Sequence, residues 1–350
     1  MNLFTNTQFK NHEQVSFFHC EQTGLKAIIA IHNTNLGPAL GGCRMWAYQN
    51  DDEALYDVLR LSQGMTYKAA LAGLPLGGGK SVIIGDPKKE KTPAMMRAMG
   101  RAVESLGGRY IIAEDVGTCV EDMNEMSSIC HYVTGALKNN EGSGDPSPVT
   151  AYGVFVGIKA AVKSRLQKEN LQGLSVALQG LGNVGYHLAK LLHEEGVKLY
   201  VTDIDENKIS KAVKELGAIA VPFHDIYDVE ADIFAPCALG AIINDETIPR
   251  LKFPIIAGAS NNQLAEPRHG DMLAERGILY APDYAINTGG LISVYSDYAL
   301  RNGIDFGREK VFSHTEKIGK TLEMIFAEAK SQGISTAVMA DRLAERIFLK

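Results

Sequence analysis

The chain has 350 residues, of which 45% are hydrophobic, and at this length two domains are the better expectation. Its 35 Lys and Arg face 41 Asp and Glu, which gives a net charge of −6 without a long run of one sign. This balance argues against a nucleic-acid-binding surface and a membrane-surface patch, and it favours small-molecule partners.

The five cysteines predict free thiols in a reducing compartment, because they are scattered and form no C-x-x-C pair. The N-terminal residues show no cationic segment followed by a long apolar one, and the longest apolar run, around Leu25 to Ile31, is too short to span a bilayer. We therefore expect a cytoplasmic protein.

Short β-rich runs alternate with helical patterns in the first part of the chain. We expect strands at 25–32, 81–86 and 109–115, and helices near 51–64, 93–106 and 121–130. This alternation predicts an α/β fold.

A second series of strands follows a segment that interrupts regular structure. Three Gly and two Pro in 141–153 precede a helical pattern that could form a hinge, and we place the domain boundary near residue 135. The second series is expected at 174–180, 198–203, 231–237, 253–258 and 277–283, a spacing typical of a doubly wound parallel sheet. From about residue 308 the pattern is helical, and the apolar stripe of Met339, Leu343 and Ile347 must pack on another part of the protein.

A glycine-rich loop in the second series predicts a dinucleotide site. Gly180-Leu-Gly182-Asn-Val-Gly185 follows a strand and opens the expected helix 184–195, and Asp203 ends the next strand. The glycines allow a tight turn, close approach of a pyrophosphate and close helix packing, and the helix N-terminus attracts phosphate. A carboxylate at Asp203 accepts hydrogen bonds from a ribose 2′-OH and repels a 2′-phosphate, which favours NAD over NADP.

The stretch 64–80 combines Lys68 and Lys80 with three consecutive glycines at 77–79, which invite close approach of a ligand. It is not a nucleotide P-loop, because Leu74 stands where that motif requires a glycine. Two lysines in a cleft repel each other, so one can act as a base while the other anchors an anion. Two solvated surface lysines are the alternative, and the spacing alone does not separate the two interpretations.

Two further segments close expected strands. Asp115 is suited either to catalysis or to capping the next helix, and residues 259–263, with Asn261 and Asn262, form either a set of amide donors or an Asn-rich turn. The sequence shows no metal-ligand pattern and no G-x-S-x-G, so we assign neither a metal nor a serine nucleophile.

Together, eight segments resemble the Glu/Leu/Phe/Val family of amino-acid dehydrogenases, in the family's order and from about residue 15 to the final helix. They are LGPALGGCR (36–44), GMTYKAALAGLPLGGGK (64–80), AEDVGT (113–118), DPSPVTAYGV (145–154), QGLGNVG (179–185), APCALGAIIN (235–244), AGASNNQL (257–264) and PDYAINTGGLI (282–292).

The resemblance implies two domains that flank a cleft. Residues 1–135, completed by the C-terminal helix 330–350, would form the catalytic and oligomerisation domain, and 136–329 the Rossmann-type NAD domain. Lys68 would bind the substrate carboxylate, Asp115 would take the ammonium proton, and Lys80 would activate the water that attacks the iminium left by hydride transfer to NAD. The products would be ammonia and a 2-oxo acid.

The resemblance also implies the residues around the cofactor and the substrate. Thr150 would contact the nicotinamide carboxamide, Asn287 would lie near the nicotinamide, and Asn262 would donate to the substrate carboxylate. The cofactor set is Thr150, Gly180, Gly182, Asn183, Val184, Gly185, Asp203, Cys237, Ala238, Asn261 and Asn287. The substrate set beyond Lys68 and Asn262 is Leu40, Gly41, Gly42, Met65, Ala113, Thr134, Leu291 and Val294.

The substrate is expected to be a branched-chain L-amino acid. Glutamate-specific relatives carry a lysine where this chain has Leu40, and an unpaired carboxylate beside Leu40 would be unfavourable. Leucine, valine and isoleucine are not ranked, because one methylene changes affinity by only about 1–3 kcal/mol in an apolar pocket. An aromatic amino-acid substrate and a non-catalytic NAD-binding sensor are the alternatives. We expect a homo-oligomer, a dimer rather than an octamer, because the chain ends sooner after its last helix than octameric relatives do.

Overall fold

The computed structural model describes residues 3–136 and 145–350, and contacts divide the chain into two compact units. The first unit comprises Met1–Gly144, Ser293–Arg308 and Ala344–Lys350, and the second comprises Asp145–Ile292 and Glu309–Leu343. The expected first domain was 1–135 together with the C-terminal helix 330–350. The first unit differs from it by including 293–308 and only 344–350 of that helix. Residues 141–144 of the segment predicted to interrupt regular structure lie outside the described residues.

The first unit contains a mixed five-stranded sheet in the order β1-β2-β4-β3-β5. β2 pairs antiparallel with β1 and β4, and β3 runs parallel to β4 and β5. The elements are η1 (Leu3–Thr5), β1 (Gln14–Cys20), η2 (Glu21–Thr23), β2 (Leu25–Asn33), β3 (Ala39–Trp46), α1 (Asp51–Leu71), β4 (Gly77–Ile84), α2 (Pro93–Glu104), β5 (Tyr110–Glu114) and α3 (Val120–Ser127). β1 and β3 were not predicted, and β4 begins four residues before the expected strand.

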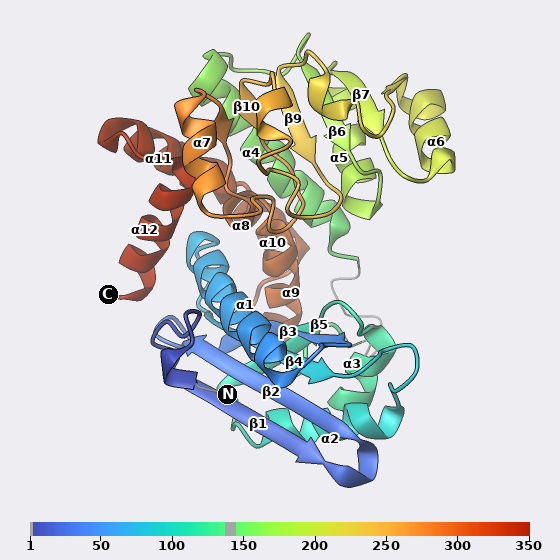
Figure 1. Ribbon diagram of the computed structural model, residues 1–350, viewed down its shortest axis with the longest axis vertical. Coiled ribbons are helices and arrows are strands. Elements are labelled where there is room, and N and C mark those ends of the chain that lie inside the picture. Colours follow the sequence, from blue (N-terminus) through green and yellow to red (C-terminus); the bar gives the residue numbers. More distant parts are fainter. Residues whose placement is uncertain (1–2, 137–144) are drawn as a thin grey trace. The chain divides into compact units, whose positions relative to one another are not determined.

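Helices α1 and α2 cover opposite faces of this sheet (Figure 1). Because successive side chains of a strand point to opposite faces, Val82 packs with Leu55 of α1, whereas Ile83 packs with Met99 of α2. Helix α1 begins where the side chain of Asn50 accepts a hydrogen bond of 2.9 Å from the backbone N–H of Glu53. The start of α1 is therefore set by its own sequence, and its length of 21 residues lets it run across the sheet.

The second unit contains a six-stranded parallel sheet in the order β11-β10-β9-β6-β7-β8, with helices on both faces (Figure 1). Its elements are α4 (Ser147–Leu166), β6 (Ser175–Gln179), α5 (Asn183–Glu194), β7 (Lys198–Thr202), α6 (Glu206–Leu216), β8 (Ile219–Ala220), η3 (Ile226–Asp228), β9 (Ile233–Pro236), η4 (Ile248–Arg250), β10 (Ile255–Ile256), α7 (Arg268–Glu275), β11 (Leu279–Tyr280) and α8 (Asp283–Ile286), followed by α9 (Gly289–Arg301), which crosses into the first unit, and by α10 (Arg308–Thr315), α11 (Lys317–Gln332) and α12 (Thr336–Phe348). The chain starts at the central β6, builds outward to β8, and resumes on the other side at β9. This order confirms the predicted doubly wound sheet, and the reversal between β6 and β9 is where such folds bind nucleotides.

The core of the second unit lies on its central strands. Phe234 of β9 is fully buried, and its ring centroid lies 5.2 Å from that of Phe253 in a stacked pair. The predicted apolar stripe on the last helix is also buried at Met339 and Leu343. Across residues 3–136 and 145–350, no helix is both long and apolar enough to cross a membrane.

Candidate active site

One face of the first unit's sheet gathers most of the residues predicted to act on the substrate. β3, β4 and β5 are parallel neighbours, and every second side chain of each points to the face covered by α1. The residues that alternation assigns to this face are Leu40, Gly42 and Arg44 on β3, Gly78 and Lys80 on β4, and Ala113 on β5, with Asp115 directly after it.

Lys80 and Asp115 form an ion pair on this face between Nζ and Oδ2. Lys80 is buried, with 8% of its side chain exposed, and 19% of the Asp115 side chain is exposed, whereas the preceding Glu114 is exposed. Asp115 does not cap the next helix, because α3 begins at Val120 with Cys119 as its N-cap. Of the two roles considered for Asp115, its position supports the chemical one.

A second cation reaches Asp115, and the sequence analysis did not predict it. Nε of Arg44 lies 3.6 Å from Oδ2 of Asp115, and Nη1 of Arg44 donates to Oδ2 of Asp57 on α1 at 2.8 Å. Burial acts to raise the pKa of Asp115, but the charges of Lys80 and Arg44 outweigh burial and lower it. Asp115 is therefore ionised near neutral pH and able to accept a proton.

The turn after β5 holds Asp115 in place. The hydroxyl of Thr118 donates to the carbonyl of Cys43 at 2.9 Å, and the backbone N–H of Asp115 donates to the Thr118 hydroxyl at 3.0 Å. Gly117 has a φ of +83°, and a Cβ there would lie 2.1 Å from the Met45 carbonyl oxygen. The turn is thus fastened to β3 at two points, which limits the movement of the carboxylate.

The three glycines before Lys80 belong to a strand and accommodate neighbouring protein groups. A Cβ would lie 2.0 Å from the Asn33 carbonyl oxygen at Gly77, 2.0 Å from the Thr66 backbone nitrogen at Gly78, and 2.7 Å from the Tyr110 ring at Gly79. Other parts of the protein fill the space that a side chain would occupy at each of these glycines. The expectation that a ligand approaches there is therefore wrong. Because these glycines have no side chains, α1 and β5 can pack close to the strand that carries Lys80.

The other predicted substrate residues of the first unit lie on adjoining elements. Gly42 pairs with Ala113 across β3 and β5, and the hydroxyl of Thr134 donates to the carbonyl of Val294 at 3.2 Å. The half-buried Met65 and Lys68 lie on α1, which packs on β4, and Leu40 is buried on β3. A Cβ at Gly41 would lie 1.7 Å from the Gly79 carbonyl oxygen, so only glycine fits there. Leu291 lies earlier on α9 than Val294, within the second unit.

In the second unit, the glycine-rich loop joins β6 to α5 as expected. Gly180 has a φ of +98°, and a Cβ at Gly185 would lie 2.0 Å from the Gly180 carbonyl oxygen, so both positions require glycine. At Gly182, by contrast, a Cβ would meet no described atom within 4 Å. Gly182 is the N-cap of α5 and supplies no side-chain cap to the N–H groups of the first turn, where Asn183 and Val184 lie.

Asp203 directly follows β7, the strand beside β6, and its carboxylate binds the glycine-rich loop. One carboxylate oxygen, Oδ2, accepts a hydrogen bond of 2.6 Å from the backbone N–H of Leu181, and Oδ1 accepts one of 2.9 Å from that of Asp205. These bonds hold the carboxylate beside the glycine-rich turn. An open face at Gly182, an uncapped helix N-terminus and a fixed carboxylate fit a dinucleotide, the pyrophosphate at the loop and the ribose at Asp203.

The remaining cofactor residues lie at the ends of β9 and β10 and near α8. A Cβ at Gly180 would lie 2.7 Å from that of Ala238, and one at Gly185 would lie 3.2 Å from that of Cys237, so both residues border the loop. Asn287 donates through Nδ2 to Oδ1 of Asn261 at 2.8 Å. Oδ1 of Asn287 is buried and has no hydrogen-bond partner among the described residues, so it remains available to a ligand.

Asn262 and Thr150 complete this set. Asn262 adopts a left-handed φ of 51°, and its backbone N–H donates to the Asp283 carboxylate. The hydroxyl of Thr150 donates to the Pro146 carbonyl at 2.9 Å, and a Cβ at Gly290 would lie 2.9 Å from Oγ1 of Thr150.

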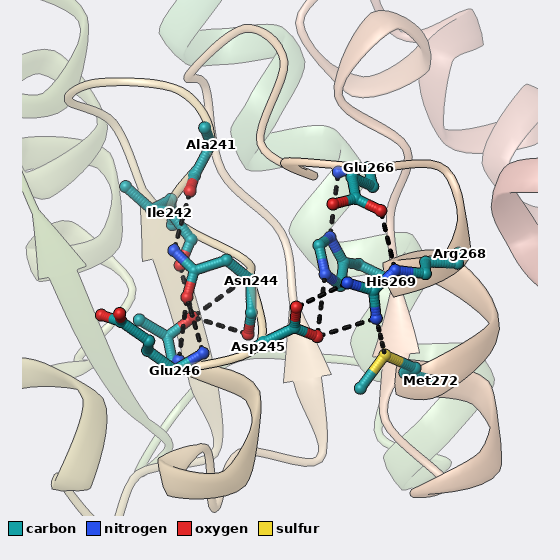
Figure 2. A network of polar contacts seen from close by, with 10 residues as sticks. Ala241, Ile242, Asn244, Asp245, Glu246, Glu266, Arg268, His269 and Met272 are labelled. Carbon is teal, nitrogen blue, oxygen red and sulfur yellow. Dashed lines mark hydrogen bonds and ion pairs between the residues drawn. The ribbon is translucent and has the colours of Figure 1, made fainter.

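A polar network joins the loop after β9, which begins near Ala238, to the segment after β10, which contains Asn262 (Figure 2). Nη2 of Arg268 donates to Asp245 at 2.5 Å, and Nε2 of the buried His269 lies 3.4 Å from Oδ1 of the same carboxylate. The backbone N–H of Ala241 donates to the Asn262 carbonyl at 2.7 Å. The loops after β9 and β10 are thus fixed to each other, which limits the movement of Ala238 and Asn262 at their starts.

No group of three or more His, Cys, Asp or Glu side chains in the described parts of the chain is arranged to hold a metal ion.

Comparison with known proteins covers nearly all of the chain. Residues 12–131 match the family described as Glu/Leu/Phe/Val dehydrogenase, dimerisation domain, and residues 142–207 and 200–345 match Glutamate/Leucine/Phenylalanine/Valine dehydrogenase. Leucine dehydrogenase of Geobacillus stearothermophilus is 56% identical over 345 residues, which cover 99% of this chain and 93% of that protein. L-tryptophan dehydrogenase of Nostoc punctiforme is 51% identical over 346 residues, covering 99% of this chain and 96% of that protein.

The crystal structure of L-tryptophan dehydrogenase from Nostoc punctiforme is similar to this structure with a TM-score of 0.86 at 49% identity, over 97% of this chain and 96% of that one. The matches confirm the family and the two-domain α/β fold predicted from the sequence. The chain belongs to the Glu/Leu/Phe/Val family of amino-acid dehydrogenases.

Proposed function

We propose that this protein catalyses the NAD-dependent oxidative deamination of a branched-chain L-amino acid, leucine together with valine and isoleucine, to the 2-oxo acid and ammonia, and the reverse reductive amination. The observation that carries the proposal is the buried Lys80 beside the ionised Asp115, in a chain whose second unit has a loop suited to a dinucleotide. A non-catalytic NAD-binding sensor would need the loop but not this costly pair of buried charges.

The first unit would bind the amino acid and move its protons. The Lys68 ammonium would hold the substrate carboxylate by charge, with Asn262 of the second unit as an additional donor. Asp115 would take a proton from the α-ammonium, because the amine must be neutral before hydride leaves Cα. Lys80 would activate the water that adds to Cα of the iminium left by hydride loss. Collapse of the resulting carbinolamine would break its C–N bond and release ammonia and the 2-oxo acid.

When bound, NAD would supply the hydride acceptor for this reaction. The pyrophosphate would be held by Gly180, Gly182, Gly185 and the backbone of Asn183 and Val184, and the adenosine ribose by Asp203. Thr150 would contact the carboxamide of the nicotinamide, and Asn287 would lie near the nicotinamide, with Cys237, Ala238 and Asn261 lining the rest of the site. Because Asp203 is a fixed carboxylate, it would repel a 2′-phosphate, and we expect kcat/KM with NAD to exceed that with NADP by at least about tenfold.

The preference for an aliphatic side chain is supported by Leu40. It lies on the Lys80 face of the sheet, is buried, and offers no cation to a second carboxylate, which disfavours glutamate. Leucine dehydrogenases at 52–56% identity further support leucine as a substrate. An aromatic substrate is the second candidate, favoured by the 51% identity to an L-tryptophan dehydrogenase.

The experiment is to follow NADH absorbance with a panel of L-amino acids, and to run the reverse reaction with 2-oxo acids and ammonia. We expect kcat/KM for leucine, valine and isoleucine to exceed that for phenylalanine, tryptophan and glutamate by about tenfold or more. A preference for tryptophan or phenylalanine would support the second candidate. If no amino acid reduces NAD, the enzyme proposal is wrong.

We also propose that the protein is a homo-oligomer, because residues 12–131 match a dimerisation domain. A dimer rather than an octamer stays a prediction from the sequence. Light scattering of the eluted protein should give twice the chain mass of 37.9 kDa. The cytoplasmic location expected from the sequence stays a prediction, and the five free cysteines are compatible with it.

A further inference from the structure

Arg44 and Asp57 join the proposed catalytic carboxylate to helix α1. Arg44 follows Gly42 on the same face of β3, with Nε 3.6 Å from Oδ2 of Asp115 and Nη1 2.8 Å from Oδ2 of Asp57. The exposed fractions of the Arg44 and Asp57 side chains are 21% and 15%. The charges therefore alternate in sign from Lys80 through Asp115 and Arg44 to Asp57.

Asp57 is itself held by two neighbours. The hydroxyl of Tyr48 donates to its Oδ2 at 2.8 Å, and Nη2 of Arg60 lies 3.2 Å from its Oδ1. Side chains locked by several bonds hold a group more accurately than a single exposed pair does. The guanidinium of Arg44 is thus held from the α1 side by Asp57, and its Nε lies within ion-pair distance of Oδ2 of Asp115 at 3.6 Å.

We propose that Arg44 is a positioning residue of the deamination reaction, which keeps Asp115 charged and aimed beside Lys80, and that Asp57 moderates this effect by sharing the charge of Arg44. The inference rests on the proposed function, since it assigns Asp115 the role of proton acceptor. It adds a residue to the site and couples the carboxylate to α1, the helix that also carries Lys68.

The charged groups that act on Asp115 come from three strands. Lys80 on β4 and Arg44 on β3 are cationic, and the exposed Glu114 on β5 is an acid of like sign. The charge of Asp115 also acts on three nearby titratable groups, Cys43, Tyr48 and Tyr110. Burial raises the pKa of Cys43 to about 12 and raises the pKa of both tyrosines, so these groups are neutral. Arg44 is therefore the cation besides Lys80 whose removal should alter the titration of Asp115.

The test is the pH profile of kcat/KM for leucine in four variants. Removing the cation in Arg44→Gln raises the pKa of Asp115, so the acid limb should move to higher pH by about one unit. Activity at the optimum should fall about tenfold to 100-fold, because the base is less well placed. Arg44→Lys keeps the charge and should recover part of both losses.

Asp57→Asn separates an electrostatic role from a merely structural one. It removes the anion that shares the charge of Arg44, so the acid limb should move to lower pH, opposite to Arg44→Gln. Arg97→Gln is the matched control, because Arg97 pairs with Glu125 on α3 and is 42% exposed. Its profile should match that of the wild type. An unshifted acid limb in Arg44→Gln, or an upward shift in Asp57→Asn, would overturn the proposal.

A second measurement does not depend on turnover. The Asp115 carboxyl can be titrated by ¹³C NMR in the free protein, assigned with Asp115→Asn, with and without Arg44→Gln. An upward shift of its midpoint supports the proposal even if the wild type is inactive with every amino acid, an outcome that would refute only the proposed function. An unchanged midpoint in a variant that still binds NAD and unfolds at the wild-type temperature refutes the role of Arg44.

Discussion

The two units build their sites from different materials. In the first unit the proposed site consists of side-chain charges, with Lys80 and Asp115 proposed to react and Arg44 to position Asp115. Ion pairs hold these groups together at three neighbouring strands. In the second unit the groups around Gly180 and Gly182 are mostly backbone, shaped by the absence of side chains. The first site therefore depends on keeping its charges paired, and the second depends on keeping space for the ligand empty.

This difference determines how each site fails. Removing one partner of a buried ion pair leaves the other charge uncompensated, which costs about 3–5 kcal/mol. Adding a methyl group to one glycine of the loop changes no charge. The methyl group instead clashes with the neighbouring backbone or occupies space that a ligand needs. Substitutions should therefore separate chemistry from cofactor binding.

The largest expected effect comes from Lys80→Ala. It removes the group proposed to activate water and leaves Asp115 with Arg44 alone, so kcat/KM should fall by about 10³- to 10⁴-fold. The Kd for NAD should stay within about twofold, since the dinucleotide loop belongs to the other unit. Steady-state kinetics and NAD titration measure the two effects.

Lys89→Ala serves as the control for Lys80→Ala. Lys89 follows the end of β4, is 81% exposed and pairs with Asp86, so both kcat/KM and the Kd for NAD should be unchanged. Equal losses of turnover and NAD affinity in Lys80→Ala would contradict the separation of the two sites.

The same contrast explains what the sequence alone could predict. The dinucleotide loop was recognised because its requirements lie within six residues and follow from backbone geometry, together with Asp203 on the next strand. Lys80 and Asp115 lie 35 positions apart, and their spacing did not show that they meet; only the family resemblance assigned them roles.

Arg44 and Asp57 were missed because their meeting depends on how α1 packs on β3. A signal was nevertheless present: Leu40, Gly42 and Arg44 alternate along one strand, so Arg44 shares the face of the predicted substrate residues. β3 itself was overlooked, since two glycines in its middle lower its apparent β propensity. Those glycines are required by the close approach of Gly79 and Asp115.

An intermediate effect is expected from a pair of alanine substitutions in the second unit. Gly182→Ala adds a methyl where no described atom lies within 4 Å, so the fold should tolerate it. If the pyrophosphate lies there, NAD should bind about tenfold to 100-fold more weakly. Gly185→Ala places its methyl 2.0 Å from the Gly180 carbonyl oxygen and should destabilise the unit itself by about 1–3 kcal/mol.

The two variants are compared by calorimetric titration of NAD and by thermal unfolding. Weaker binding at an unchanged unfolding temperature is expected only for Gly182→Ala. Unimpaired NAD binding by that variant would show that the pyrophosphate does not approach Gly182.

The smallest expected effect tests whether the charge dependence of the first unit extends to its stability. His32 is buried, its Nδ1 lies 2.8 Å from the Thr66 hydroxyl, and burial lowers its pKa from 6.5 to about 4. Burial likewise lowers the pKa of the neighbouring His12. Since the folded state binds the proton less tightly than the unfolded state, stability is complete above pH 6.5 and declines as the pH falls toward 4.

The first unit should therefore lose about 2 kcal/mol of unfolding free energy over that range from His32 alone. Trp46, the single tryptophan of the chain, lies on β3, so its fluorescence during urea unfolding reports on this unit. His32→Gln should flatten the pH dependence, while His193→Gln, an exposed substitution on α5, should leave it unchanged. If stability declines as steeply in His32→Gln, other groups cause the acid sensitivity. In that case, only the face with Lys80 and Asp115 would depend on buried charge in the first unit.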